Sequence, residues 1–222
     1  AVWNSMVAGI VFQHNGTQSL RRELMRNAEL RQVCGFDPMR GMKAVPLPCV
    51  YTRLYHKLIA HQADVDAMFD VLVDRLRVLL PGLGRHLAVD SKGVDSHGKP
   101  TQKTEADGRR DTDADWGTKT YKGVRADGTA WEKIKHWFGY KIHLIIDAVY
   151  ELPLGYVVTR ASANDSPHLL PLVEGLDARH PEVAGEAQSL AADMAYDAED
   201  ILKGLYDIHG IKPIIDTRHL WK

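Results

Sequence analysis

The sequence has few cysteines, no long apolar run and almost no net charge, and each of these absences excludes a class of protein. Cys34 and Cys49 are the only cysteines among the 222 residues. Two cysteines are too few for a disulfide framework, so we predict two reduced, buried thiols in a cytoplasmic protein. No apolar run approaches the roughly 20 residues that a membrane-spanning helix needs, so we expect no membrane partner.

The overall charge and the start of the chain lack two further signals. The formal net charge is -1, so any binding of nucleic acid must depend on local basic patches. The apolar start of the chain has no basic segment before it, which argues against a signal peptide. It also has no initiator Met, and we therefore expect a trimmed or partial chain.

The first part of the chain has the periodicity of helices, which predicts a mainly helical N-terminal domain over residues 1–82. Apolar residues recur at helical spacing in three segments, residues 3–33, 49–62 and 64–80. Arginines are interleaved in the first segment, namely Arg21, Arg22, Arg26 and Arg31. Such a basic helix face either binds DNA or is simply solvated.

From residue 83 onwards the pattern changes to short apolar runs with polar segments and helices between them. These runs predict strands at residues 86–89, 137–149, 155–160, 189–192 and 211–215. Residues 91–130 are rich in Lys, Thr, Asp and Gly, so we expect a long polar insertion there. Pro213 favours an edge position for the last strand. The fold class is therefore α/β, built on a mixed sheet.

Two of the predicted strands end in the same way, in LAVD at residues 87–90 and in LAAD at residues 190–193. Functional groups gather beyond the carboxyl ends of strands in open α/β sheets, so Asp90 and Asp193 meet if these strands are parallel neighbours. Paired carboxylates suit Mg²⁺ or Mn²⁺, and two such ions clamp the oxygens of a phosphodiester displacement. Aspartates at strand ends also serve as helix caps or turn formers, and the spacing alone favours that alternative.

Several longer motifs surround these aspartates. LAVDSKGVDSHG occupies residues 87–98, and LAADMAYDAEDI, with Asp193, Tyr196 and Asp197, occupies residues 190–201. Between them lies the segment that begins DADWGTKTYKG and continues through WFGYKIHLIIDA and ELPLGYVVTR to PHLLPLV. LRRELMRNAELRQVCGFDP and VYTRLYHKL stand upstream. In this order the motifs resemble those of the DDE transposases of bacterial insertion sequences, and the resemblance covers nearly the whole chain.

The resemblance implies a ribonuclease-H-like catalytic core over residues 83–222. It implies that Asp90 and Asp193 are catalytic ligands for two Mg²⁺ (or Mn²⁺) ions. It also implies DNA partners, namely transposon ends and target DNA, which a homodimer cleaves and joins in the bacterial cytoplasm. The family's third carboxylate is a Glu well beyond the second Asp, and nothing in this chain matches its motif. We therefore expect an inactive fragment; the alternatives are a dead DNA-binding remnant and a metal-dependent nuclease of the same fold.

Basic and aromatic residues alternate between the two aspartate motifs. Such a mixture suits phosphates and splayed bases, although a solvated polar loop has the same composition. Trp137, Phe138 and Tyr140 begin a predicted strand and are expected in the core. The basic residues predicted to contact DNA are Lys119, Lys122, Arg125, Lys133, Lys135 and Lys141. Four nearby acids lack the EF-hand pattern, so we assign them to the solvated insertion: Asp107, Asp111, Asp113 and Asp115.

Overall fold

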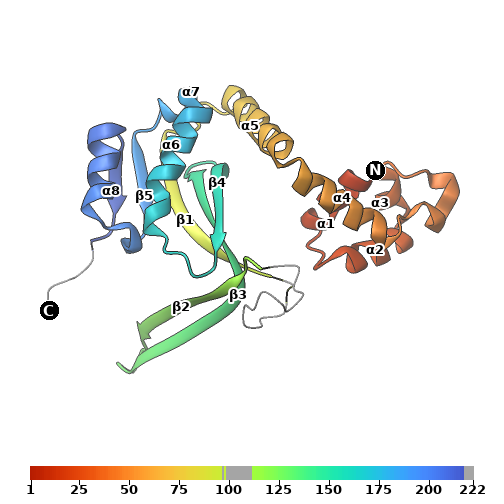
Figure 1. Cartoon of the computed structure of the whole chain (residues 1–222), viewed down its shortest axis with the longest axis horizontal. Coiled ribbons are helices and arrows are strands. Elements are labelled where there is room, and N and C mark those ends of the chain that lie inside the picture. Colours follow the sequence, from red (N-terminus) through yellow and green to blue (C-terminus); the bar gives the residue numbers. More distant parts are fainter. Residues whose placement is uncertain (97, 99–111, 218–222) are drawn as a thin grey trace. The chain divides into compact units, whose positions relative to one another are not determined.

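The chain forms two compact units, residues 1–69 and residues 70–222. The computed structural model describes residues 1–96, 98 and 112–217 (Figure 1). The division between the units falls inside one continuous helix, α5 (Gln62–Leu79), whereas the sequence pattern changes at residue 82. The second half of this helix therefore belongs with the sheet that follows it.

The first unit is helical, as the sequence predicts. Its elements are α1 (Val2–Val11), α2 (Thr17–Arg26), α3 (Ala28–Val33), the 3₁₀ segment η1 (Pro38–Ala44) and α4 (Pro48–Ala60). The prediction of one helix over residues 3–33 is wrong, because the chain turns at Gly16 and again at Asn27. The Asn27 side chain accepts a hydrogen bond from the Leu30 amide and so caps a new helix.

A small apolar core holds this unit together. It consists of Leu20, Leu24, Leu30, Cys34, Phe36, Val45 and Tyr51. Both cysteines are free thiols, as predicted, but only Cys34 is buried. The prediction of a buried Cys49 is wrong, because α4 turns Tyr51 towards the core and leaves Cys49 exposed.

The second unit is built on a mixed six-stranded sheet. Its strands are β1 (His86–Asp95), β2 (Asp115–Val124), β3 (Ala130–Asp147), β4 (Leu152–Arg160), β5 (Ser189–Ala192) and β6 (Lys212–Ile215). The order is β2-β3-β1-β5-β6, and β4 also pairs with β3. The pairs of β3 with β1, β2 and β4 are antiparallel, whereas β5 is parallel to β1 and to β6. This arrangement is α/β and consistent with a ribonuclease-H-like core, and β6 lies at the edge where Pro213 predicted it.

Helices lie between and after the strands, and some of them contact the sheet. Beyond α5, they are η2 (Ser166–His168), α6 (Leu169–Arg179), α7 (Pro181–Ala184), η3 (Met194–Tyr196), α8 (Glu199–Lys203) and the π-helical turn η4 (Gly204–Ile208). Helix α6 buries four apolar side chains and contacts β3 and β4, and η4 contacts β6. The fully buried His180 hydrogen-bonds Asp74 and Asp70 and so ties the end of α6 to α5. Within the described residues, no helix is long and apolar enough to cross a bilayer.

The polar insertion expected over residues 91–130 is largely β-structure. Strand β1 continues to Asp95, β2 follows from Asp115, and β3 begins at Ala130, so that a long hairpin projects from the rest of the sheet (Figure 1). The prediction fails there because most of these strand residues are exposed on both faces, and no alternation of apolar and polar residues marks them. Asp107 and Asp111 lie outside the described residues.

Candidate active site

Strands β1 and β5 are parallel neighbours, which is the condition under which Asp90 and Asp193 were expected to lie together. Strand β1 does not end at Asp90, however, but continues to Asp95. Strand β1 pairs with β5, and the last pair in register is Val89 with Ala192. The next residue of each strand is an aspartate, Asp90 on β1 and Asp193 just after β5. Both carboxylates are solvent-exposed. The topology therefore brings the two acids to the same edge of the sheet.

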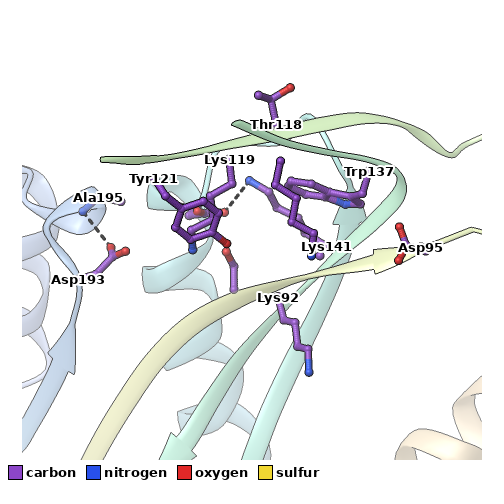
Figure 2. Close-up of a pocket in the computed structure, with 13 residues that line it drawn as sticks. Lys92, Asp95, Thr118, Lys119, Tyr121, Trp137, Lys141, Asp193 and Ala195 are labelled. Atoms are coloured by element: carbon purple, nitrogen blue, oxygen red, sulfur yellow. Dashed lines mark hydrogen bonds and ion pairs between the residues drawn. The ribbon is translucent and has the colours of Figure 1, made fainter. Parts of the chain in front are cut away.

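Each of these carboxylates uses one oxygen for a local hydrogen bond. Asp90 Oδ1 accepts from the Ser91 amide at 2.7 Å, and Asp193 Oδ1 accepts from the Ala195 amide at 2.9 Å (Figure 2). Asp193 thus caps η3, as the alternative interpretation of the sequence proposed. Among the described residues, none donates to the second oxygen of either carboxylate. Those two oxygens are available to a cation.

Tyr196 is buried beside the two aspartates. Its side chain is 1% exposed, and its hydroxyl has no hydrogen-bond partner among the described residues. Burial raises the pKa of Tyr196, and the negative charges of Asp165, Asp193 and Asp90 raise it further, so the phenol stays protonated. A buried hydroxyl without a partner among the described residues, near several carboxylates, fits a hydrogen bond with a water ligand of a hydrated cation. The donor set, all oxygen, suits Mg²⁺ or Mn²⁺.

A third acid, Asp165, belongs to the same site, and sequence reasoning missed it. It lies just before η2, and its Oδ1 accepts a hydrogen bond from Lys141 Nζ at 2.9 Å. Lys141 Nζ also donates to the Ala163 carbonyl at 2.7 Å. Lys141, predicted to contact DNA, is therefore largely buried and held in place by two acceptors. The one sequence signal for Asp165 is its position before the Ser-Pro pair that begins a helix.

His143 is buried next to this pair. A hydrogen bond of 2.9 Å joins its Nε2 to Thr159 Oγ1, and its Nδ1 lies 3.8 Å from Asp165 Oδ1. Its ring centroid is 4.5 Å from that of His168. Burial lowers the pKa of His143 to about 4, helped by His168 and opposed by Asp165. The imidazole is neutral at pH 7 and packs beside Asp165, with Thr159 as its hydrogen-bond partner.

We expect His143 to make stability depend on pH. Its pKa is about 4 in the folded chain and 6.5 when unfolded, so the unfolded chain binds the extra proton between these values. The stabilisation is complete above pH 6.5 and is lost as pH falls towards 4. Between pH 7 and pH 5 the wild type should lose about 2 kcal/mol more unfolding free energy than His143→Gln, measured by urea denaturation. Equal losses would contradict a neutral, buried His143.

A cleft of about 390 Å³ connects this acidic site with the hairpin. Asp193, Asp165 and Lys141 line it from the core of the sheet, and Ser91, next to Asp90, also lines it. The hairpin supplies Lys119, Tyr121 and Lys135. Figure 2 shows Tyr121 and Lys119 projecting from the hairpin into the space above β1, with Asp193 on the opposite side. The cleft is thus lined by both acidic and basic side chains, with the lysines of the hairpin facing a core that contains Asp193 and Asp165.

The other basic residues predicted to contact DNA fall into two groups. On the hairpin, Lys119 and Lys122 lie on β2, Lys133 and Lys135 on β3, and Arg125 in the turn. On α2, Arg22 and Arg26 are exposed, whereas Arg21 donates to the Pro46 carbonyl. Arg31 is buried and donates to the last carbonyls of α2, so it is structural. Trp137 and Phe138 are buried in the core, as predicted.

The sheet topology is consistent with a ribonuclease-H-like core, and Asp90 and Asp193 give it an acidic site where β1 and β5 stop pairing. The transposase DDE domain family matches residues 81–220, which is more than half of the chain, and the chain belongs to this family. The family suggested by the sequence motifs is thereby confirmed, together with a transposase-type function and the family's general use of divalent metal ions. Comparisons with curated proteins and with solved structures gave no match.

Of the three acids at this site, only Asp90 and Asp193 have no ion-pair partner among the described residues, and these two do not form a complete metal cage. Among the described residues, no group of three or more His, Cys, Asp or Glu side chains is placed to hold a metal ion. Asp165 is a further acid close enough to raise the pKa of Tyr196, but its charge is already neutralised by Lys141. Asp90 and Asp193 are therefore the residues that would hold a divalent ion.

Proposed function

We propose that this protein binds transposon-end DNA and catalyses metal-dependent strand cleavage followed by strand transfer. The observation that carries the proposal is the position of Asp90 and Asp193, each one residue beyond the last pair that joins the parallel strands β1 and β5, inside the residues that match the family. Each carboxylate keeps one oxygen without a donor among the described residues. Two such oxygens are the minimal protein contribution to a Mg²⁺ or Mn²⁺ site.

The roles of the surrounding residues follow from their contacts. A divalent ion, when bound, supplies charge neutralisation and activation of the attacking oxygen in phosphodiester displacement. Asp90 and Asp193 would hold it, and the protonated Tyr196 would donate a hydrogen bond to the site. Asp165 holds the Lys141 ammonium beside the cleft, where it faces the phosphate of the bound strand. Positioning and charge neutralisation are the main tasks of a protein in phosphoryl transfer.

We further propose that the 222-residue chain alone does not cleave DNA. The described residues offer two carboxylates at the site, and the family's chemistry uses a third, a Glu. A DNA-binding protein without cleavage activity is therefore the second candidate function for the chain as it stands. The same resemblance supports a homodimer, which would hold two transposon ends and the target DNA together in the bacterial cytoplasm.

Binding of Mn²⁺ tests the site without requiring activity. The chain should bind Mn²⁺, measured as loss of the free-ion signal in electron paramagnetic resonance. Asp90→Asn and Asp193→Asn should each weaken this binding about tenfold or more, because each removes one of two charged ligands. Asp200→Asn, in the exposed first turn of α8, is the matched control and should bind Mn²⁺ like the wild type. Equal binding by all four proteins would contradict the assigned ligands.

A strand-transfer assay separates a transposase from a nuclease of the same fold. A protein preparation that carries the third carboxylate is given a pre-cut transposon end with a free 3′-hydroxyl, target DNA and Mg²⁺. A transposase joins the end to the target, whereas a nuclease only hydrolyses DNA. Hydrolysis without any joined product would support the nuclease alternative.

A further inference from the structure

The hairpin of β2 and the first half of β3 has two chemically different faces. Side chains alternate between the faces along each strand, and directly paired residues share a face. Lys119 pairs with Lys135, and Tyr121 pairs with Lys133, so these four residues share one face. We call this set the cleft face, because Lys119, Tyr121 and Lys135 line the cleft that contains Asp193. Thr118 also borders the cleft, but its side chain lies on the opposite face of the hairpin, as Figure 2 shows.

The opposite face of the hairpin neutralises its own charge. Lys122 lies directly opposite Glu132, and their charged groups are 3.3 Å apart. Thr118 hydrogen-bonds His136 at 3.0 Å. This face therefore offers no excess of positive charge to an anionic partner, although Lys122 has the same residue type as the lysines of the cleft face.

The cleft face instead concentrates positive charge. Lys119 and Lys135 lie directly opposite one another, and Lys133 follows on the same side. Like charges in directly paired positions destabilise a sheet. None of these three lysines forms an ion pair with an acidic side chain among the described residues. Their arrangement is unfavourable in the free protein and becomes favourable when a chain of phosphates lies between them.

Tyr121 adds a flat, exposed ring to the cleft face. It is 41% exposed, and the Lys119 ammonium lies 5.9 Å from its ring centroid. Trp137 lines the same cleft, but it is 8% exposed and donates its indole N–H to the Tyr140 carbonyl. Trp137 is therefore part of the fold, whereas Tyr121 presents an exposed ring next to positive charge. Exposed aromatic rings beside basic side chains are the means by which proteins hold unpaired nucleotides.

We propose that the cleft face binds an unpaired segment of the DNA strand whose phosphate enters the carboxylate site. Lys119, Lys133 and Lys135 contact its phosphates, and one base stacks on Tyr121. The cleft gives the direction of the strand, because Lys119, Tyr121 and Lys135 line the same cleft as Asp193. The inference rests on the proposed function, since it requires DNA as the substrate. It adds that the cleft face of the hairpin binds the DNA and that the bound segment is unpaired.

Salt dependence of binding tests the role of the lysines. Affinity of the chain for single-stranded DNA is measured by fluorescence anisotropy at several salt concentrations. The triple variant Lys119→Gln, Lys133→Gln, Lys135→Gln should reduce the slope of log K against log salt by about 2, which corresponds to three lost phosphate contacts. Lys122→Gln is the matched control and should leave the slope unchanged. Circular dichroism of each variant confirms that the sheet is folded.

Tyr121→Leu tests the stacked base separately. It should weaken binding of single-stranded DNA about tenfold with an unchanged salt slope, and it should leave binding of fully paired duplex unchanged. A Lys122→Gln effect equal to that of the cleft-face lysines, or equal losses of Tyr121→Leu on both DNA forms, would overturn the inference alone. A wild-type chain that binds no DNA would overturn the proposed function as well.

Discussion

Asp90→Asn and Asp193→Asn should each abolish Mg²⁺-dependent cleavage of transposon-end DNA while leaving DNA binding largely intact. The substitution keeps the size of the side chain and removes the negative charge that would hold the ion. Loss of a metal ligand removes several kcal/mol of transition-state stabilisation, so we expect the cleavage rate to fall by about a thousandfold or more. The measurement is single-turnover cleavage of an end-labelled duplex by a preparation that contains the third carboxylate.

Asp95→Asn is the control for this experiment. Asp95 is the last residue of β1, the strand that contains Asp90, and it lines the cleft. Asp95→Asn therefore removes the same charge from the same strand, but away from the metal site. Asp95 lies five residues beyond Asp90 along an extended strand, and we expect its variant to cleave within about twofold of the wild type. Retained cleavage in Asp90→Asn or Asp193→Asn would show that the ion is held elsewhere.

The pairing of these two aspartates is the part of the site that could be predicted from the sequence. The runs before Asp90 and Asp193 are short, wholly apolar and bounded by polar residues, which is the pattern of buried parallel strands. Strand β5 was predicted with its observed bounds, Ser189–Ala192. Because the strands are buried and adjacent, the residues after them must meet. Local pattern and topology agree here, and so the prediction was accurate.

The support around the aspartates could not be predicted in the same way. Asp165 and Lys141 are 24 residues apart, and they meet only because β3, β4 and the loop before η2 fold back on one another. No feature of the sequence around His143 predicts that its side chain is buried. Its burial follows from the pairing of β3 with β1 and β4. Interactions of this kind are properties of the tertiary structure.

The faces of the hairpin show the same limit. The sequence indicated a basic, aromatic segment, but it could not divide Lys119 from Lys122, three residues further on. Their separation follows from the register, in which Lys119 meets Lys135 and Lys122 meets Glu132. A shift of one residue in one strand would replace both partners, so that Lys119 would meet Ile134 or His136 and Lys122 would meet Trp131 or Lys133. Residues of similar composition therefore lie on two faces of the hairpin that differ in net charge.

Gly139→Ala should destabilise the second unit by about 3 kcal/mol, because Gly139 lies where three strand ladders meet. It pairs with Asp95 of β1 and with Asp115 of β2, and β4 begins to pair with β3 at the next residue. A Cβ atom at Gly139 would collide with the Val94 carbonyl oxygen and the Ser96 amide nitrogen. These are backbone atoms that cannot move without breaking the ladder, so the strands must separate there. Thermal unfolding followed by circular dichroism measures the loss.

Gly128→Ala is the control for this substitution, because Gly128 lies in the hairpin turn with no atom within 4 Å of an added Cβ. Its φ of +83° disfavours alanine by about 1 kcal/mol, so a small loss is expected even without a clash. The difference between the two variants isolates the collision with β1. Since the hairpin joins the core through Gly139, we also expect Gly139→Ala to weaken binding of single-stranded DNA, while Gly128→Ala binds normally. Equal stability losses in the two variants would show that the strands adjust to a side chain at this junction.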